Sequence, residues 1–153
     1  FGQQESIIPI MGMIEELGEL THAHLKELQG IRKSNFLADK KDAIADITIY
    51  LLNYFNCIDK DISLIEEVIN APHEGDTSNN IILNISHKLG KLSENEMYNK
   101  SLIIDTNYCS YILFSLKEYA ENIELNLLTI VNEVWEQVKL RDWKKYPKDG
   151  RTK

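Results

Sequence analysis

The chain has 153 residues, a net charge of −7 and 43% hydrophobic residues, which is the composition of an ordinary globular protein. Its length fits one domain that buries about two-thirds of its unfolded surface, and its acidic balance excludes broad, nonspecific binding to nucleic acid. No apolar run is long enough to span a bilayer and no signal-peptide pattern opens the chain, so we expect a cytoplasmic protein without membrane contact.

Long segments with helical period, broken by only three Pro and seven Gly, predict one all-α domain over residues 1–153. The predicted helices cover, in chain order, residues 6–29, 38–56, 61–70, 81–96, 105–122 and 126–144. The first helix should end at Gly30, a natural C-cap. Its expected apolar side carries Ile10, Ile14, Leu17, Leu20 and Leu28. Residues 71–80 have the composition of a loop.

Polar side chains form a stripe on the otherwise apolar helix at residues 38–56. The stripe contains Asp42, Asp46, Ile49, Asn53 and Asn56, which recur at steps of four and three and so share one helix face. A helix that is apolar on its other faces should be buried, and a buried carboxylate pair is costly unless a metal or another charge compensates it. Asp42 and Asp46 also repel each other, so the stripe predicts a nearby cation.

A second acidic group lies on the first helix, at Glu15, Glu16 and Glu19. Taken alone, these acids would form a solvated helix face. If the first two long helices pack antiparallel, however, Glu16 and Glu19 meet Asp42 and Asp46, and Glu15 lies at the edge of the group. Hard cations such as Mg²⁺ prefer carboxylate ligands, and the chain has no EF-hand-like calcium loop. The two groups together indicate an enzyme that uses a metal ion.

The second half of the chain resembles the first, which favours an internal duplication. Residues 13–20 align with residues 85–92 through a shared LGxL. The acids Glu15, Glu16, Glu19, Asp42 and Asp46 align with His87, Lys88, Lys91, Thr106 and Ser110. We therefore expect a metal-binding half at about 5–70, a degenerate repeat or insertion at about 80–125, and a closing helix at about 126–145. Chance similarity between amphipathic helices is the alternative, and the two lysines either face the carboxylates or lie on a solvated face.

The segments EELGEL and DAIADITIYLL, with the ending VWEQVKLRDWKKYPKDG, resemble the MazG-like all-α nucleoside triphosphate pyrophosphohydrolases of the phage type. The signature of that family is EExxE on one helix and ExxD on the next. Glu15, Glu16 and Glu19 match the first motif, and Asp46 matches the Asp of the second. The Glu of ExxD falls at Ala43, and Asp42 on the same face as Asp46 is the expected substitute. The resemblance covers residues 5–56 and 126–150.

The resemblance implies a MazG-like helical bundle that cleaves a nucleoside triphosphate to the monophosphate and pyrophosphate. Mg²⁺, with Mn²⁺ as an alternative, would be held by Glu16, Glu19, Asp46 and Asp42, while Glu15 would activate the attacking water. Family members commonly form dimers or tetramers, so a homo-oligomer is expected. The alternatives are a catalytically weakened relative that binds nucleotide or protein, to which Ala43 points, and a purely structural helical bundle.

Four further residues are candidates for binding the substrate. Asn53 lies on the polar stripe beyond Asp46, where its amide either bonds a sugar or base or satisfies a neighbouring helix. The others are Lys139, Arg141 and Lys144 near the end of the last helix. Basic residues near the C-terminus of the family suggest contacts with substrate phosphates. The alternative is that these cations complement only the helix dipole.

Overall fold

The computed structural model describes residues 4–30, 35–58, 63–99 and 101–141. Within these ranges the chain is all-helical and has no strand, which confirms the predicted fold class. The elements are α1 (Ile7–Gln29), α2 (Phe36–Cys57), α3 (Ser63–Ile69), α4 (Ser78–Glu94), the π-helical turn η1 (Asn95–Asn99), α5 (Leu102–Asn122) and α6 (Leu127–Val138). None of the described helices combines the length and the apolar character needed to cross a membrane.

Capping side chains explain where the helices begin and end. Gly30 ends α1 in the left-handed conformation, at φ 61°, as its position predicted. α4 begins three residues before the predicted start because the hydroxyl of Thr77 accepts a hydrogen bond from the backbone N–H of Asn80. α6 ends at Val138. The predicted helical residues 142–144 lie outside the described residues.

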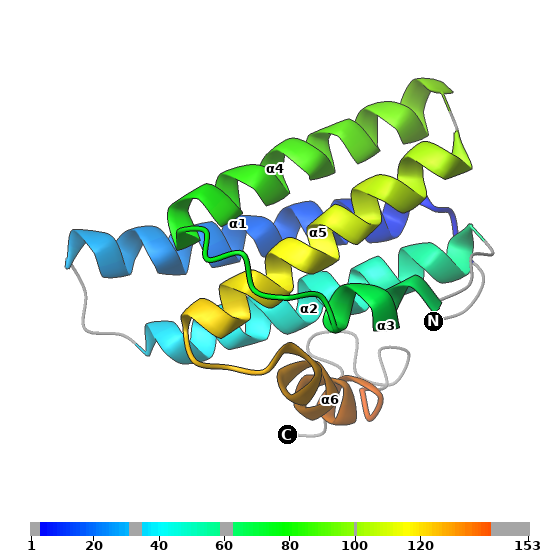
Figure 1. The fold of residues 1–153 in the computed structure, drawn as a ribbon. Helices are drawn as coiled ribbons and strands as arrows, with labels where there is room; N and C mark the ends of the chain where they lie inside the picture. Colours follow the sequence, from blue (N-terminus) through cyan, green and yellow to red (C-terminus); the bar gives the residue numbers. More distant parts are fainter. Residues whose placement is uncertain (1–3, 31–34, 59–62, 100, 142–153) are drawn as a thin grey trace.

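The four long helices form a bundle of two hairpins, α1 with α2 and α4 with α5 (Figure 1). Their facing sides share one core, whose fully buried members include Ile10, Leu20, Ile47, Leu51, Ile85 and Leu116. α6 packs against α2, and α3 packs against α5. α6 therefore lies on the hairpin to which it is not directly joined, whereas α3 lies on the hairpin whose first helix, α4, follows it in the chain. The internal duplication stays a prediction.

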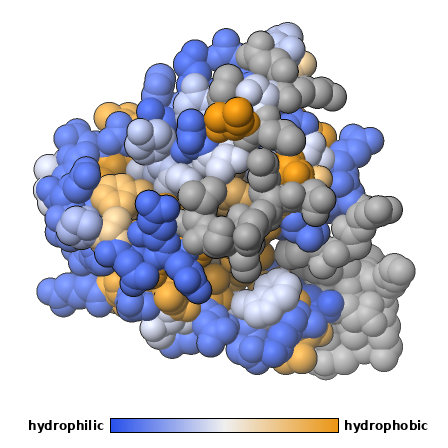
Figure 2. All heavy atoms as spheres, turned by 45° about the vertical axis from the view of Figure 1, so that its right-hand side comes forward, coloured by the Kyte–Doolittle hydropathy of each residue, from blue (hydrophilic) through white to orange (hydrophobic). Residues whose placement is uncertain are grey.

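The buried side of α1 differs from the predicted one at two positions. Ile10, Leu17 and Leu20 are buried as expected, but Ile14 is 51% exposed and Leu28 is 62% exposed. Met13 and Ala23 are buried in α1 as well, because the facing helices cover a stripe centred away from Ile14. Hydrophilic side chains cover much of the described surface in Figure 2, with hydrophobic ones between them. The predicted homo-oligomer stays a prediction that light scattering would test.

Candidate active site

A close contact between a glycine and an aromatic ring sets the register of α1 against α2. A Cβ atom added to Gly12 would lie 2.5 Å from the ring of Tyr50, so a residue without a side chain is needed for this approach. Because the two helices run antiparallel, the residues four positions further along α1 and four positions back along α2 face the same groove. These residues are Glu16 and Asp46. The predicted meeting of the two acidic motifs follows from this register.

Five carboxylates share an electrostatic environment in the groove between α1 and α2. The pKa of Glu16 is raised from its ordinary value of 4.5 to about 7, first by burial and then by the negative charges of Asp46, Glu19, Glu15 and Asp42. The charges of all four other predicted acids therefore act on Glu16. A half-buried carboxylate among like charges is electrostatically unfavourable, and a bound cation would relieve that cost.

Asp46 is the second half-buried acid of the groove, and the positive charge of Arg141 acts on it. Burial raises the pKa of Asp46, and the positive charge of Arg141 opposes that rise, while Asp42 and Glu19 add to it. Arg141 follows the end of α6 and belongs to the basic group that the sequence assigned to the substrate. The packing of α6 on α2 brings it to the site. Val134 of α6 is buried against Ala45 and Ile49 of α2, and the ammonium of Lys41 pairs with the carboxylate of Glu133.

The expectation that the stripe is a buried carboxylate pair is wrong. Asp42 is exposed and Asp46 is half-buried, because the acidic edge of α2 lies at the rim of the α1–α2 groove. Glu15 and Glu19 are exposed as well. The rim is hollowed into a shallow cavity of about 430 Å³, whose lining includes Glu15, Glu19 and Asp42. This acidic hollow brings together three of the five predicted acids, and its lining does not include Glu16 or Asp46.

Two residues of this region escaped the sequence analysis. Asp39 lines the same hollow, one turn before Asp42, and its i−3 spacing from Asp42 was a usable signal. Tyr50 lies on the other side of Glu15, in a second hollow of about 480 Å³. Burial raises the pKa of Tyr50, and the charges of Glu16, Glu15 and Asp46 add to that rise. Its i+4 spacing from Asp46 was a usable signal, whereas its approach to Glu15 and Glu16 depends on the tertiary contact with Gly12.

Ala43, where the family motif has glutamate, is only 1% exposed and belongs to the hydrophobic core. A longer side chain at this position would have to displace packed neighbours. Asp42 is directed to the groove instead, where its charge acts on both Glu16 and Asp46. The predicted substitution of Asp42 for the missing glutamate is compatible with this arrangement.

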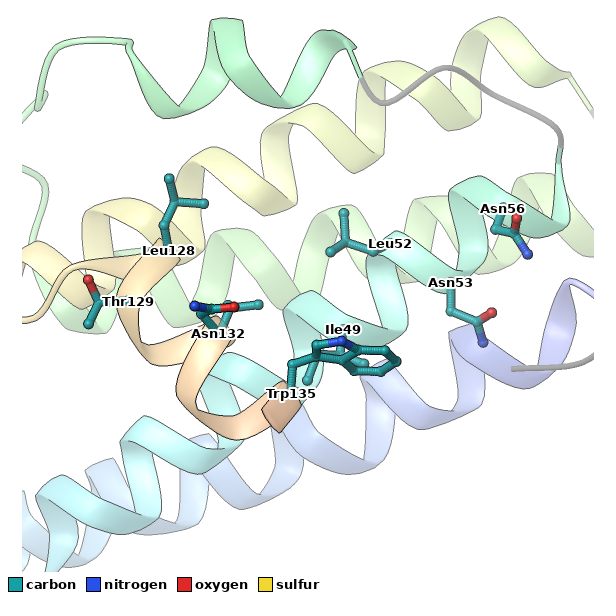
Figure 3. Close-up of a pocket in the computed structure, with 9 residues that line it drawn as sticks. Ile49, Leu52, Asn53, Asn56, Leu128, Thr129, Asn132 and Trp135 are labelled. Carbon is teal, nitrogen blue, oxygen red and sulfur yellow. The ribbon is translucent and has the colours of Figure 1, made fainter. Parts of the chain in front are cut away.

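A larger cavity, of about 770 Å³, lies between α2 and α6 and continues the polar stripe (Figure 3). It is lined by Ile49, Leu52, Asn53, Asn56, Leu128, Thr129, Val131, Asn132 and Trp135. Asn53 is only 5% exposed, and its Nδ2 atom is buried without a hydrogen-bond partner among the described residues. The alternative that Asn53 satisfies a neighbouring helix therefore does not hold for Nδ2. Trp135 reaches across from α6, so this tryptophan borders the cavity.

The other lysines singled out by the sequence that the structure describes contact residues outside the acidic groove. Lys139 is exposed and forms an ion pair with Glu136 of its own helix, while Lys144 lies outside the described residues. In the second half, Lys88 lies with its Nζ 4.7 Å from the ring centroid of Tyr111, and Lys91 pairs with Glu94. Neither Lys88 nor Lys91 is among the charges that shift the pKa of Glu16 or Asp46.

A second group of charged residues, missed by the sequence analysis, joins the loop before α4 to α5. His73 Nδ1 lies 2.7 Å from Glu118 Oε1 and 3.1 Å from Glu121 Oε2. Glu118 is 2% exposed and also accepts the backbone N–H groups of Glu74 and Gly75. Lys117 pairs with Glu121 at 3.0 Å. Since protein donors already satisfy these carboxylates, we interpret the group as a structural clamp.

Comparisons with protein-family models, with curated proteins and with solved structures find no match. The function of the chain is therefore inferred from its own residues.

Proposed function

We propose that the protein is a Mg²⁺-dependent nucleotide pyrophosphohydrolase, which cleaves a nucleoside triphosphate to the monophosphate and pyrophosphate. The observation that carries the proposal is the register of α1 against α2, which brings Glu16 and Asp46 to one groove with Glu15, Glu19 and Asp42 close enough for their charges to raise the pKa of Glu16. Several carboxylates that share one groove and its excess negative charge suit a hard divalent cation. The cavity beside this cluster, with its apolar walls and buried amide, suits the remainder of a nucleotide.

The residues divide into those that would hold the metal and those that would act on the substrate. Glu16, Glu19, Asp42 and Asp46 would hold Mg²⁺ or Mn²⁺. A bound metal would offset the charge of the phosphates and polarise the scissile group. Arg141, whose charge acts on Asp46, would contact a phosphate oxygen once the acids are neutralised.

In the proposed reaction, water attacks the α-phosphorus. The bond from the α-phosphorus to the bridging oxygen breaks, and pyrophosphate leaves. Glu15, exposed at the edge of the cluster, would take the proton of the attacking water. Positioning and charge neutralisation carry most of the rate in this type of reaction, so few specialised groups are needed.

One observation favours a second candidate, a catalytically weakened relative that binds nucleotide or a protein partner. Ala43 replaces the glutamate of the family motif and is packed in the core, so one carboxylate of the expected ligand set is missing. Asp42 is exposed and has a shorter side chain than glutamate. A looser metal site would lower turnover more than it lowers binding.

The decisive experiment is pyrophosphate release from a panel of nucleoside triphosphates with Mg²⁺ or Mn²⁺, combined with calorimetric measurement of metal binding. Asp46→Asn removes the negative charge of one proposed ligand, and Glu66→Gln, at an exposed position of α3, is the matched control. Release that Asp46→Asn abolishes and Glu66→Gln keeps supports the enzyme. Metal or nucleotide binding without release favours the weakened relative. Release that survives Asp46→Asn, or the absence of both binding and release, refutes the proposed site.

A further inference from the structure

We propose that the cavity between α2 and α6 holds the nucleobase of the substrate and selects bases that present a carbonyl oxygen to Asn53. This inference rests on the proposed nucleotide chemistry and adds the substrate class. It concerns the cavity between α2 and α6, which contains none of the predicted acids.

The first support is the state of the Asn53 amide. Asn53 is only 5% exposed, yet its Nδ2 atom has no hydrogen-bond partner among the described residues. Buried donors are nearly always paired, because an unsatisfied one keeps the cost of leaving water without a compensating bond. Asn53 lines the cavity, so a ligand there can supply the missing acceptor.

The second support is the shape of the cavity. Ile49 and Leu52 form an apolar wall on α2, and Trp135 extends its indole ring from α6 towards Asn53 (Figure 3). A volume of about 770 Å³ lies in the range of small-molecule pockets. A flat, apolar-faced ring that stacks on an indole and carries a polar edge fits such a space, and a nucleobase has these properties.

The third support is the position of the cavity relative to the acids. Asn53 follows Asp46 by seven residues, so it lies on the same helix face about 10 Å further along the axis of α2. A nucleotide whose phosphates lie at the carboxylates would extend its base in this direction. The charge of Arg141, three residues beyond the end of α6, acts on Asp46, and Trp135 belongs to α6 itself. α6 and the residues that directly follow it thus reach both the phosphate end and the base end.

The amide chemistry predicts which bases are favoured. The Nδ2 group donates hydrogen bonds, so it pairs with a carbonyl oxygen and opposes an amino group. Uracil has a carbonyl oxygen at the ring position where cytosine has an amino group. Hypoxanthine has a carbonyl oxygen at the ring position where adenine has an amino group. We therefore expect uridine and inosine compounds to bind more tightly than cytidine and adenosine compounds, respectively.

The test measures binding through the fluorescence of Trp135, with Trp143→Phe as the background because the chain has two tryptophans. The probes are the four nucleosides and their α,β-imido triphosphates, which are not cleaved between the α- and β-phosphates. We expect a preference of about tenfold or more for the carbonyl member of each pair. Asn53→Leu keeps the shape of the side chain and should abolish the preference. Asn70→Leu, at an exposed position after α3, is the control.

Thermal unfolding separates a ligand-binding role of the amide from a structural one. Since Nδ2 has no partner to lose, Asn53→Leu should leave the melting temperature unchanged or raise it. A lowered melting temperature with an unchanged base preference would overturn the proposal, as would no fluorescence change with any probe. Base-selective binding without any pyrophosphate release would support the pocket and refute the hydrolase. Pyrophosphate release without base-selective binding would support the hydrolase and refute the proposed base pocket.

Discussion

Replacing Glu16 with glutamine should stabilise the metal-free protein at neutral and basic pH. The folded-state pKa of Glu16, about 7, lies above the ordinary value of 4.5 expected in the unfolded chain. As the pH rises between these two values, the unfolded chain releases the proton first, so this group lowers the free energy of unfolding across that window. Below pH 4.5 both states are protonated and the penalty vanishes. Above pH 7 the folded protein carries the full cost of ionising Glu16.

The size of the effect follows from the same two values. Full linkage would amount to about 3 kcal/mol above pH 7, and solvent screening of a half-buried group reduces this to about 1–2 kcal/mol. For a chain of this length, Glu16→Gln should then raise the melting temperature at pH 8 in EDTA by about 2 to 8 °C. The gain should shrink towards zero as the pH approaches 4.5.

Thermal unfolding of the wild type, Glu16→Gln and the exposed control Glu66→Gln, at pH 5 and pH 8, provides the assay. Millimolar Mg²⁺ should stabilise the wild type and Glu66→Gln but have little effect on Glu16→Gln, since a ligand stabilises only the state that binds it. The reasoning is refuted if Glu16→Gln is less stable than the wild type at pH 8 in EDTA. It is also refuted if the difference between them does not depend on pH.

Two further variants test the packing around the site, and a third tests the clamp on α5. Gly12→Ala should cost about 1–3 kcal/mol and weaken metal binding, because its methyl group meets an aromatic ring, whereas Gly18→Ala should not destabilise. Equal melting temperatures for the two would contradict the proposed register. Ala43→Glu should destabilise by at least about 2 kcal/mol by placing a carboxylate in the core, and a stable, more active variant would show that this position reaches the metal. Glu118→Ala should speed hydrogen exchange in the loop before α4, and unchanged protection would argue against the clamp.

The positions of the acids and the helical class could be predicted because both depend on local spacing. A period of 3.6 residues puts Asp42 and Asp46 on one face, and Glu16 and Glu19 on another, whatever the tertiary fold. Gly30 ended α1 as predicted, since a left-handed cap is a property of a few neighbouring residues. The start of α4 was missed because the Thr77 cap lies within a segment with the composition of a loop.

Exposure and juxtaposition depended on contacts between residues far apart in the chain. The periodic pattern puts Asp42 and Ala43 on different sides of the helix, but it could not tell that Asp42 lies at an open rim, because the neighbouring helices decide which side is covered. The Gly12–Tyr50 contact, which aligns the acids, joins two helices. The cavity beside Asn53 exists only because α6 packs back onto α2. Local periodicity determines which side chains share a helix face, whereas only the packing of one helix on another decides what each face meets.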